Sequence, residues 1–472
     1  MHEINNIDKR RRTIKMFSNY FLVALVVTVL TGVIVLAASG YDIDRSTGQV
    51  IQNGILLVET EPRGANVTIN GQMESAKTPA RYPIPQGRYT VMVDKEGYRS
   101  WQSTVEIFGS RVNWIYYPRL VPELINTRPV SSLQNLNFIE HSQQRDSILI
   151  NPTTNLRSFT LFDLGANQVA GAPFVLPEAL YAVNEDDVIE GRVNFDAWSP
   201  DGRYVILQHV HSGQVDYIVV DLDDLASSYN LDEALGIEFD SVVFTHDNRL
   251  ALLQEGLLFT TGVTSPVVAA PVETNVRDII LSSNDTWVET DDGLQINLAR
   301  LSEPENVLLS SSDLSTDYAV SVWEGDLTLI QSNSANVRIY KDFSTDPSAD
   351  NVVSKILSIE ENFLVQPSPD GRFVLAAGSS DSLIYDQETL ETYEVAYGVG
   401  SAIQWLDGYR LAYSLGGQLY ISDFNGSNEY QIASYDAGYP AVVDEDFTAI
   451  YSVDLRDADG QLILRESSLE LE

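Results

Sequence analysis

The chain has 472 residues, of which 67 are acidic and 29 are basic, and its formal net charge is −38. A surface this negative repels phosphate backbones, so composition argues against nucleic-acid binding. The absence of cysteine excludes disulfides, thiolate metal sites and cysteine nucleophiles, and for an exported body it favours a bacterial or archaeal surface.

The N-terminus predicts a membrane anchor. Residues 1–16 carry a basic cluster, and residues 17–38 contain no charged side chain. As a helix, that uncharged segment would span roughly 33 Å, enough to cross a hydrocarbon layer. Positive charge marks the cytoplasmic side, so we expect a single-pass helix with the body outside the cytoplasm. A signal peptide cleaved near the small residues 37–40 is the alternative, and it places the body on the same side.

Residues 39–53 are interpreted as a tether. Asp42, Asp44 and Ser46 alternate there, as in the first part of a calcium-binding loop. The twelfth loop position holds Asn53 instead of the bidentate glutamate that such a loop requires. We therefore assign no calcium site and expect a solvated turn.

Residues 54–117 read as a compact β-domain. A strand at 54–58 is followed by residues 65–69, where apolar and polar side chains alternate as in a half-buried strand. Asn70 and Gly71 then predict a tight hairpin turn, because both residue types accept positive φ.

Together with its other turns, this segment resembles the PEGA domain family. The resemblance rests on five motifs in order: Pro62-Arg63-Gly64-Ala65, Asn70-Gly71, Thr78-Pro79, Gly87-Arg88-Tyr89 and Gly97-Tyr98. Arg63 stands where the family name has glutamate. The resemblance implies a small β-sandwich of the kind found in surface-layer and other envelope proteins, and it implies no catalytic residue.

After a proline-punctuated linker at 118–131, residues 132–472 carry a repeat. Ser-Pro-Asp-Gly-Arg at 199–203 recurs at 368–372, an offset of 169 residues. A quarter of that offset is about 42 residues, the length of one propeller blade. The length predicts seven or eight blades, with eight favoured, and residues 462–465 are a candidate for the ring-closing strand.

The Ser-Pro-Asp-Gly-Arg units resemble the PD40 (WD40-like) repeats of TolB-type propellers. Weaker copies occur at 243–252 and 405–413, and several are followed by a strand that ends near an aspartate. The resemblance implies that Pro-Asp-Gly is a turn between inner strands, which is a structural role. In propellers generally, function lies in loops around the central channel.

The search for chemistry gives no site. No nucleophile elbow, phosphate-binding loop or metalloprotease motif is present. His209 and His211 alternate on a predicted strand and share a face, which suits zinc, yet no third ligand is evident nearby. Asp457 and Asp459 read as part of a hairpin turn. We therefore predict no catalytic, cofactor-binding or metal-binding residue and no cofactor.

The sequence thus predicts a membrane-anchored, all-β, extracytoplasmic protein of the prokaryotic cell envelope that is not an enzyme. We expect the propeller to serve as a binding or scaffold platform for an envelope protein or a cell-wall glycan. The alternative is a propeller-type carbohydrate-active enzyme, a glycosidase or lyase, whose carboxylates would be distant in sequence.

Overall fold

The chain forms two compact units, residues 1–124 and residues 125–472, and each is described by itself. The computed structural model describes residues 20–32, 34–35, 41–43, 50–133, 136–152, 155–166, 168–183, 189–282, 285–333, 336–344, 346, 351–359, 364–454 and 461–471.

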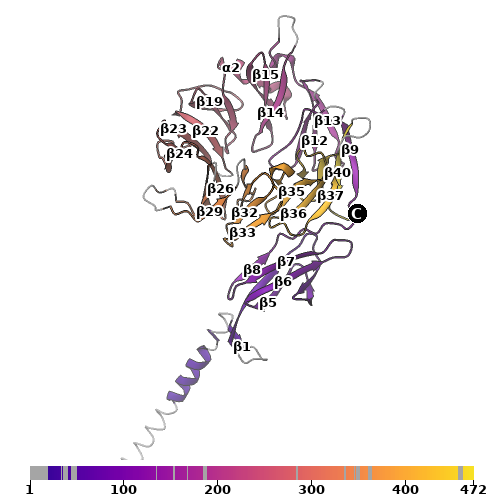
Figure 1. The fold of residues 1–472 in the computed structure, drawn as a ribbon, viewed down its shortest axis with the longest axis vertical. Coiled ribbons are helices and arrows are strands. Elements are labelled where there is room, and N and C mark those ends of the chain that lie inside the picture. The colour runs from indigo at the N-terminus through magenta and orange to yellow at the C-terminus, as the bar shows by residue number, and fades with distance from the viewer. Residues whose placement is uncertain are drawn as a thin grey trace, which may run out of the picture. The chain divides into compact units, whose positions relative to one another are not determined.

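Residues 20–32 and 34–35 of unit 1 are helical (Figure 1). Within the described part of the chain, no helix is both long and apolar enough to cross a membrane. The remainder of the predicted anchor at 17–38 lies outside the described residues, and so do the small residues 37–40. Asp44 and Ser46 of the calcium-like stretch, and both Asp457 and Asp459, also lie outside them.

The rest of unit 1 consists of two four-stranded sheets that share one core. One sheet has the order β4-β3-β6-β7; in the other, β2 pairs with β1, β5 and, in parallel, β8. Their bounds are β1 Tyr41–Ile43, β2 Val50–Val58, β3 Asn66–Ile69, β4 Gln72–Lys77, β5 Ala80–Pro85, β6 Gly87–Asp94, β7 Trp101–Ile107 and β8 Val112–Ile115.

Side chains from both sheets, among them Leu56, Val91, Trp101 and Ile115, form this core, so unit 1 is a small β-sandwich. The expected alternation of β3 is confirmed, because Val67 and Ile69 are buried while Asn66 and Thr68 are half-buried. The expected hairpin is confirmed too, with positive φ at both residues between β3 and β4.

Unit 2 contains, in its described residues, eight four-stranded antiparallel sheets. The first four are β10 Phe138–His141, β11 Ser147–Asn151, β12 Ser158–Asp163 and β13 Gly171–Val175; β14 Arg192–Trp198, β15 Tyr204–His211, β16 Gln214–Asp221 and β17 Tyr229–Asn230; β18 Ser241–Phe244, β19 Arg249–Gln254, β20 Leu257–Gly262 and β21 Glu273–Thr274; β22 Val276–Leu281, β23 Thr286–Asp291, β24 Ile296–Arg300 and β25 Leu309–Ser311.

The other four follow the same chain order until the last. They are β26 Asp317–Trp323, β27 Asp326–Ser332, β28 Asn336–Tyr340 and β29 Lys355–Ser358; β30 Leu364–Pro367, β31 Phe373–Ala377, β32 Ser382–Asp386 and β33 Thr392–Val395; β34 Gln404–Trp405, β35 Arg410–Leu415, β36 Gln418–Asp423 and β37 Tyr430–Ser434; β38 Val442–Val443, β39 Ala449–Val453, β40 Leu462–Ser468 and β9 Thr127–Leu133. Short helices are η1 Glu178–Leu180, η2 Leu225–Ser227, α2 Leu231–Leu235 and η3 Val399–Ser401.

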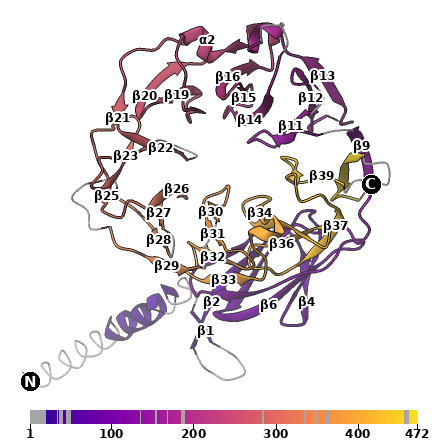
Figure 2. The ribbon, with the colours of Figure 1, turned by 45° about the horizontal axis from the view of Figure 1, so that its top comes forward.

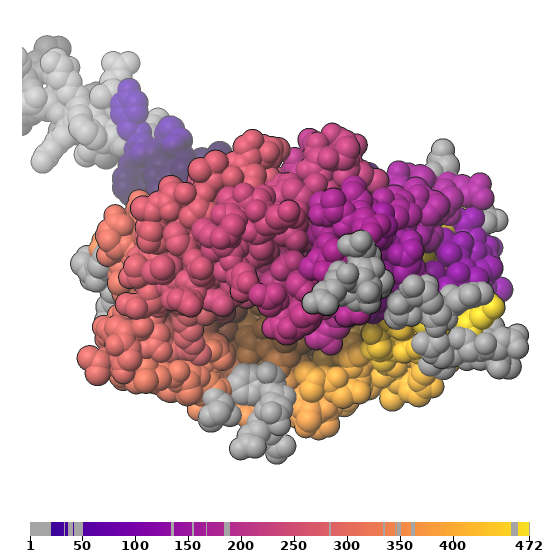
Figure 3. Space-filling view, turned by 90° about the horizontal axis from the view of Figure 1, so that it is seen from above, coloured from indigo at the N-terminus to yellow at the C-terminus, as the bar shows by residue number. Residues whose placement is uncertain are grey.

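The sheets follow one another around a ring, with the first strand of each nearest the middle (Figure 2). In space-filling view the magenta to salmon segments pack side by side and form one continuous surface (Figure 3). Buried apolar clusters lie between neighbouring sheets, because a four-stranded sheet cannot bury both of its faces alone. One such cluster joins the last sheet to the first through Leu464 and Ile148, which closes the ring. This arrangement is a β-propeller.

Ring closure involves the strand predicted at 462–465 and shortens the linker expected at 118–131. The segment 462–465 is the start of β40, the third strand of its sheet, and closure is completed by β9 pairing with it. Because β9 begins at Thr127, the linker expected at 118–131 ends earlier. β9 is difficult to predict from the sequence because it contains Pro129 and few apolar residues. An outer edge strand tolerates proline. The register of the pairing shifts between Leu464 and Arg465, opposite this proline.

Candidate functional site

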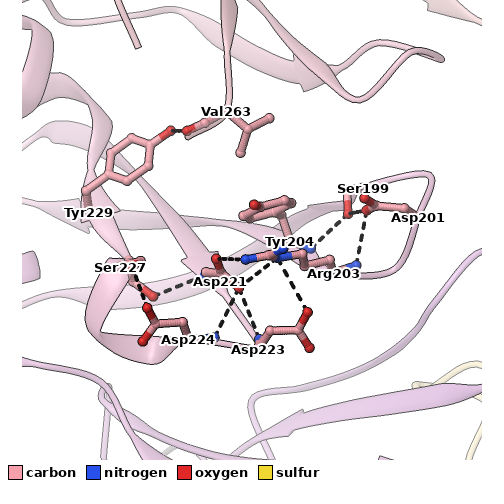
Figure 4. Close-up of polar contacts among 11 residues, drawn as sticks. Ser199, Asp201, Arg203, Tyr204, Asp221, Asp223, Asp224, Ser227, Tyr229 and Val263 are labelled. Carbon is pink, nitrogen blue, oxygen red and sulfur yellow. Dashed lines mark hydrogen bonds and ion pairs between the residues drawn. The ribbon is translucent and has the colours of Figure 1, made fainter. Parts of the chain in front are cut away.

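The repeated Ser-Pro-Asp-Gly-Arg segments form tight turns between the first two strands of their sheets. Ser199 Oγ accepts a hydrogen bond from the Tyr204 backbone N–H (2.8 Å) and donates to Asp201 Oδ1 (2.6 Å), as Figure 4 shows. In the second copy, Ser368 makes the same two bonds at 2.9 Å and 2.6 Å. The side chains of the motif's serine and aspartate therefore make hydrogen bonds within the turn.

The arginine that ends each motif pairs with the aspartate that ends the third strand of the same sheet. Arg203 binds Asp221 with both arms of its guanidinium, at 3.1 Å and 2.7 Å (Figure 4). Arg372 binds Asp386 in the same way, at 3.0 Å and 2.7 Å. The hydrogen bonds from Arg203 hold the pKa of Asp221 below its usual range. These two-point pairs tie the second strand of each sheet to the third.

First strands and the turns that follow them, from six successive sheets, line one pocket of about 270 Å³, which we call the turn-face pocket. Close backbone packing forms part of its wall: a Cβ on Gly371, whose φ is +81°, would come within 2.2 Å of the Val322 carbonyl oxygen. The described residues that line the pocket are Gln143, Pro200, Phe244, His246, Leu281, Ser282, Val320, Ser321, Val322, Pro367, Ser368, Pro369 and Gly371.

The turn-face pocket differs in character from the chain as a whole. Its described lining contains no Asp, Glu, Lys or Arg, although the chain carries 67 acidic residues. Apolar and proline side chains dominate it, with a few hydroxyl and amide groups such as those of Ser282 and Gln143. His246 adds an imidazole, and a site of this composition suits an uncharged or weakly polar segment of a partner.

Two half-buried carboxyl groups lie on the first strands of the first two sheets. Burial raises the pKa of Glu140 on β10 to about 7. Burial also raises the pKa of Asp196 on β14 to about 6, although a 2.6 Å hydrogen bond from Gln208 acts in the opposite direction. A carboxyl group that keeps its proton near neutral pH is suited to general acid chemistry.

Three side chains near the hairpin that joins β15 to β16 form what we call the histidine cluster: His209, His211 and Asp216. The ligand atoms of all three lie within 4.8 Å of one another. The side chains share a face because the two histidines alternate on β15 and Asp216 lies opposite His209 on β16.

Each member of the histidine cluster is fixed by its surroundings. His209 is fully buried, and its Nε2 donates to the Glu190 carbonyl oxygen at 2.8 Å. Burial lowers the pKa of His209, and the hydrogen bond to Glu190 acts in the opposite direction. His211 Nε2 lies 3.0 Å from Asp216 Oδ2, which also accepts a 3.3 Å hydrogen bond from Asn230.

The sequence interpretation therefore identified the histidine pair but missed its carboxylate neighbour. The signal was present: His211 and Gln214 are joined by Ser212 and Gly213, a dipeptide typical of a two-residue hairpin. That hairpin register alone places Asp216 opposite His209. His141, by contrast, lies on β10 and makes a 2.8 Å hydrogen bond to the Ser142 carbonyl.

These observations define an all-β protein in which a small β-sandwich precedes a β-propeller. Residues 53–120 match the PEGA domain family, in agreement with the resemblance seen in the turn motifs. A sequence comparison with curated proteins found no match.

Solved structures with a similar chain path include a propeller and two oligogalacturonate lyases. A Dos1 propeller is 12% identical, with a TM-score of 0.49 over 73% of this chain and 96% of that one. An oligogalacturonate lyase in complex with manganese is 14% identical, with a TM-score of 0.40 over 73% and 98%. An oligogalacturonate lyase from Vibrio parahaemolyticus is 11% identical, with a TM-score of 0.39 over 73% and 99%. At these values the likenesses carry no argument about function.

Proposed function

We propose that this protein is a non-catalytic binding or scaffold protein of the prokaryotic cell envelope, in which an eight-bladed, TolB-like propeller is the interaction platform. The observation that carries the proposal is the turn-face pocket. It brings residues of six sheets into one surface whose described lining has no Asp, Glu, Lys or Arg, while the repeated polar residues around it take part in turns and ion pairs.

The chemistry of the pocket favours recognition over reaction. Val322, Phe244 and Leu281 offer apolar contact, and hydroxyl and amide groups offer a few hydrogen bonds. The surrounding chain, beyond its basic first 16 residues, carries a formal charge of −41. Such a surface keeps the ring soluble and discourages anionic partners, so an envelope protein or a neutral cell-wall glycan fits best.

Location at the membrane is part of the same proposal and rests on the sequence. The basic cluster before the uncharged segment 17–38 supports a single-pass anchor with the N-terminus in the cytoplasm. Protease treatment of intact cells is expected to degrade both units. Protection of both units until the cells are lysed would contradict this placement.

The binding role is tested by capture of envelope material on the full-length protein. Leu281 lines the turn-face pocket and is 44% exposed, so Leu281→Asp introduces a charge there without disturbing the core. Val352→Asp, at a residue that is exposed and outside the pocket lining, is the matched control. We expect the wild type and the control to retain an envelope protein or wall polymer that Leu281→Asp loses.

Two results would count against the binding role. One is a wild-type protein that captures no envelope protein and no wall polymer. The other is capture that Leu281→Asp leaves unchanged, because the partner would then bind elsewhere.

A carbohydrate-active enzyme is the second candidate, and the position of Glu140 on the first strand of its sheet, where burial raises its pKa to about 7, favours it. A glycosidase or lyase needs an acid of this kind beside the scissile bond. The test is turnover of a panel of polysaccharides and chromogenic glycosides. Activity that Glu140→Gln abolishes would support this candidate, and a panel without turnover would leave the binding role as the better account.

A further inference from the structure

We infer that the histidine cluster binds a divalent transition-metal ion of the zinc class through His209 Nδ1, His211 Nε2 and one Asp216 oxygen. Two imidazole nitrogens and a carboxylate are donors that zinc and its neighbours accept. This inference departs from the sequence-based expectation of no metal ligand, because the third donor becomes visible only when β15 and β16 are paired.

The strongest observation is an unused lone pair in a buried place. His209 Nε2 donates its hydrogen to the Glu190 carbonyl, so Nδ1 must be the acceptor nitrogen of that ring. Nδ1 is buried, and among the described residues it has no hydrogen-bond partner. A buried acceptor without a donor costs free energy, and a cation placed between it and the other two donors removes that cost.

The hydrogen bond to Glu190 is also what a metal-binding histidine requires. Such a ligand usually donates its second ring nitrogen to a carbonyl or carboxylate, which fixes the tautomer and the ring orientation. The rings of His209 and His211 are stacked at 4.7 Å between centroids, and Tyr181 packs against His209 edge-on at 5.2 Å. Asn230 holds Asp216 from the other side.

The distances require only a small adjustment. Donor atoms around a tetrahedral zinc ion lie roughly 3.3 Å apart, given bonds of about 2.0–2.1 Å. The nearest pair, His211 Nε2 and Asp216 Oδ2, is already at 3.0 Å, and all three donors are within 4.8 Å.

An ion pair alone does not explain the arrangement. A proton on His211 would neutralise Asp216, but it would leave His209 Nδ1 without a donor. Three protein ligands also leave one coordination position open. Asp216 lines a pocket of about 370 Å³, together with Asn230, Asp232 and Glu233, so a water molecule or a small uncharged ligand has room to reach that position.

The inference is tested by metal titration of the full-length protein after treatment with a chelator. His2 lies outside the described residues and could bind metal with the chain terminus, so every variant is prepared with His2→Gln. Zinc chloride is titrated by calorimetry, and cobalt(II) is followed by the visible absorption of its tetrahedral complexes. We expect one equivalent of zinc to bind and to raise the melting temperature.

Two substitutions probe the ligands separately. Asp216→Asn keeps an oxygen that accepts from Asn230 and should weaken zinc binding at least tenfold. His211→Gln should remove the tetrahedral cobalt spectrum and the thermal shift. His141→Gln is the matched control, because it removes an imidazole from another sheet and should bind zinc as the parent does. Circular dichroism without metal checks that each variant is folded.

Two outcomes would overturn the inference. In the first, the chelator-treated parent protein binds no zinc. In the second, folded Asp216→Asn and His211→Gln variants bind zinc as tightly as the parent. Because these readouts require no partner, they stand or fall separately from the binding role of the turn-face pocket.

Discussion

At the scale of single residues, the repeat motif places identical side chains in different surroundings. The side chain of Arg372 is 8% exposed and that of Arg203 is 42% exposed, although both make the same two bonds to an aspartate. Arg372 also lies over the rings of Phe373 and Tyr409, at 4.9 Å and 5.7 Å from their centroids. Burial and ring contacts, rather than the motif, therefore determine how much each pair stabilises the fold.

This difference predicts unequal costs for the same substitution. Arg372→Gln leaves the fully buried Asp386 without its partner and should lower the free energy of unfolding of unit 2 by about 3 kcal/mol. Arg203→Gln should lower it much less, because solvent reaches that arginine and screens its charge. Urea unfolding of the two variants checks this. Equal losses would show that burial does not set the contribution of the pair.

A second residue-scale prediction concerns pH. Burial raises the pKa of Glu140 from its ordinary 4.5 to about 7, so the folded state holds this proton more tightly than the unfolded state does. The resulting stabilisation is complete below pH 4.5 and is lost as the pH rises through about 7. Glu140→Gln should therefore gain stability relative to the wild type between pH 5 and 8.

The measurement is the melting temperature of both proteins across that pH range. We expect the difference between Glu140→Gln and the wild type to grow with pH. A difference that stays constant would mean that the folded and unfolded states hold the proton equally well.

At the scale of elements, the ring depends on one strand that comes from the far end of the unit's sequence. β9 pairs with β40 over residues 127–133, and its Val130 and Leu133 pack against the cluster that joins the last sheet to the first. An exposed ion pair between Arg128 and Glu466, at 2.9 Å, adds little to this contact. Closure is thus mainly backbone pairing and apolar burial.

Removal of this strand should weaken the whole ring. A chain that begins at residue 136 lacks β9, exposes an edge of β40 and uncovers apolar side chains, so we expect a lower melting temperature than for a chain that begins at residue 125. Differential scanning calorimetry compares the two. Restoration of the melting temperature by an added peptide of residues 125–135 would support strand pairing as the cause.

At the scale of the whole molecule, each compact unit has a core of its own. Trp101 of unit 1 is 1% exposed and packs edge-on against Tyr117, with ring centroids 5.6 Å apart. The core of unit 2 is divided among the interfaces between successive sheets. Two cores of this kind predict two unfolding transitions.

Trp101→Ala tests that separation. Loss of the indole should destabilise unit 1 by about 3–5 kcal/mol, because it leaves a cavity in a closely packed sandwich. The transition of unit 2 should remain where it is in the wild type, as followed by calorimetry. A shift of both transitions by a similar amount would show that the two units unfold together.

The sequence by itself determined the features that are encoded locally. Turn residues such as Asn70 and Gly71, and the Ser-Pro-Asp-Gly-Arg motif, fix backbone geometry within a few positions, so the sandwich and the repeated sheets could be predicted from them. His209 and His211 were recognised as facing the same way for the same reason, since side chains alternate along a strand.

Only the tertiary structure decided the features that depend on residues far apart. The pairing of β9 with β40 joins segments more than 300 positions apart in the sequence. A short edge strand that contains a proline has no local pattern from which this pairing could be predicted. The turn-face pocket is built from strand ends and turns of six sheets, and none of these segments predicts a pocket when it is read alone. Local sequence determines backbone dihedral angles and the alternation of side chains. Ring closure and pockets arise from packing between segments that are distant in the sequence, and local sequence patterns do not encode that packing.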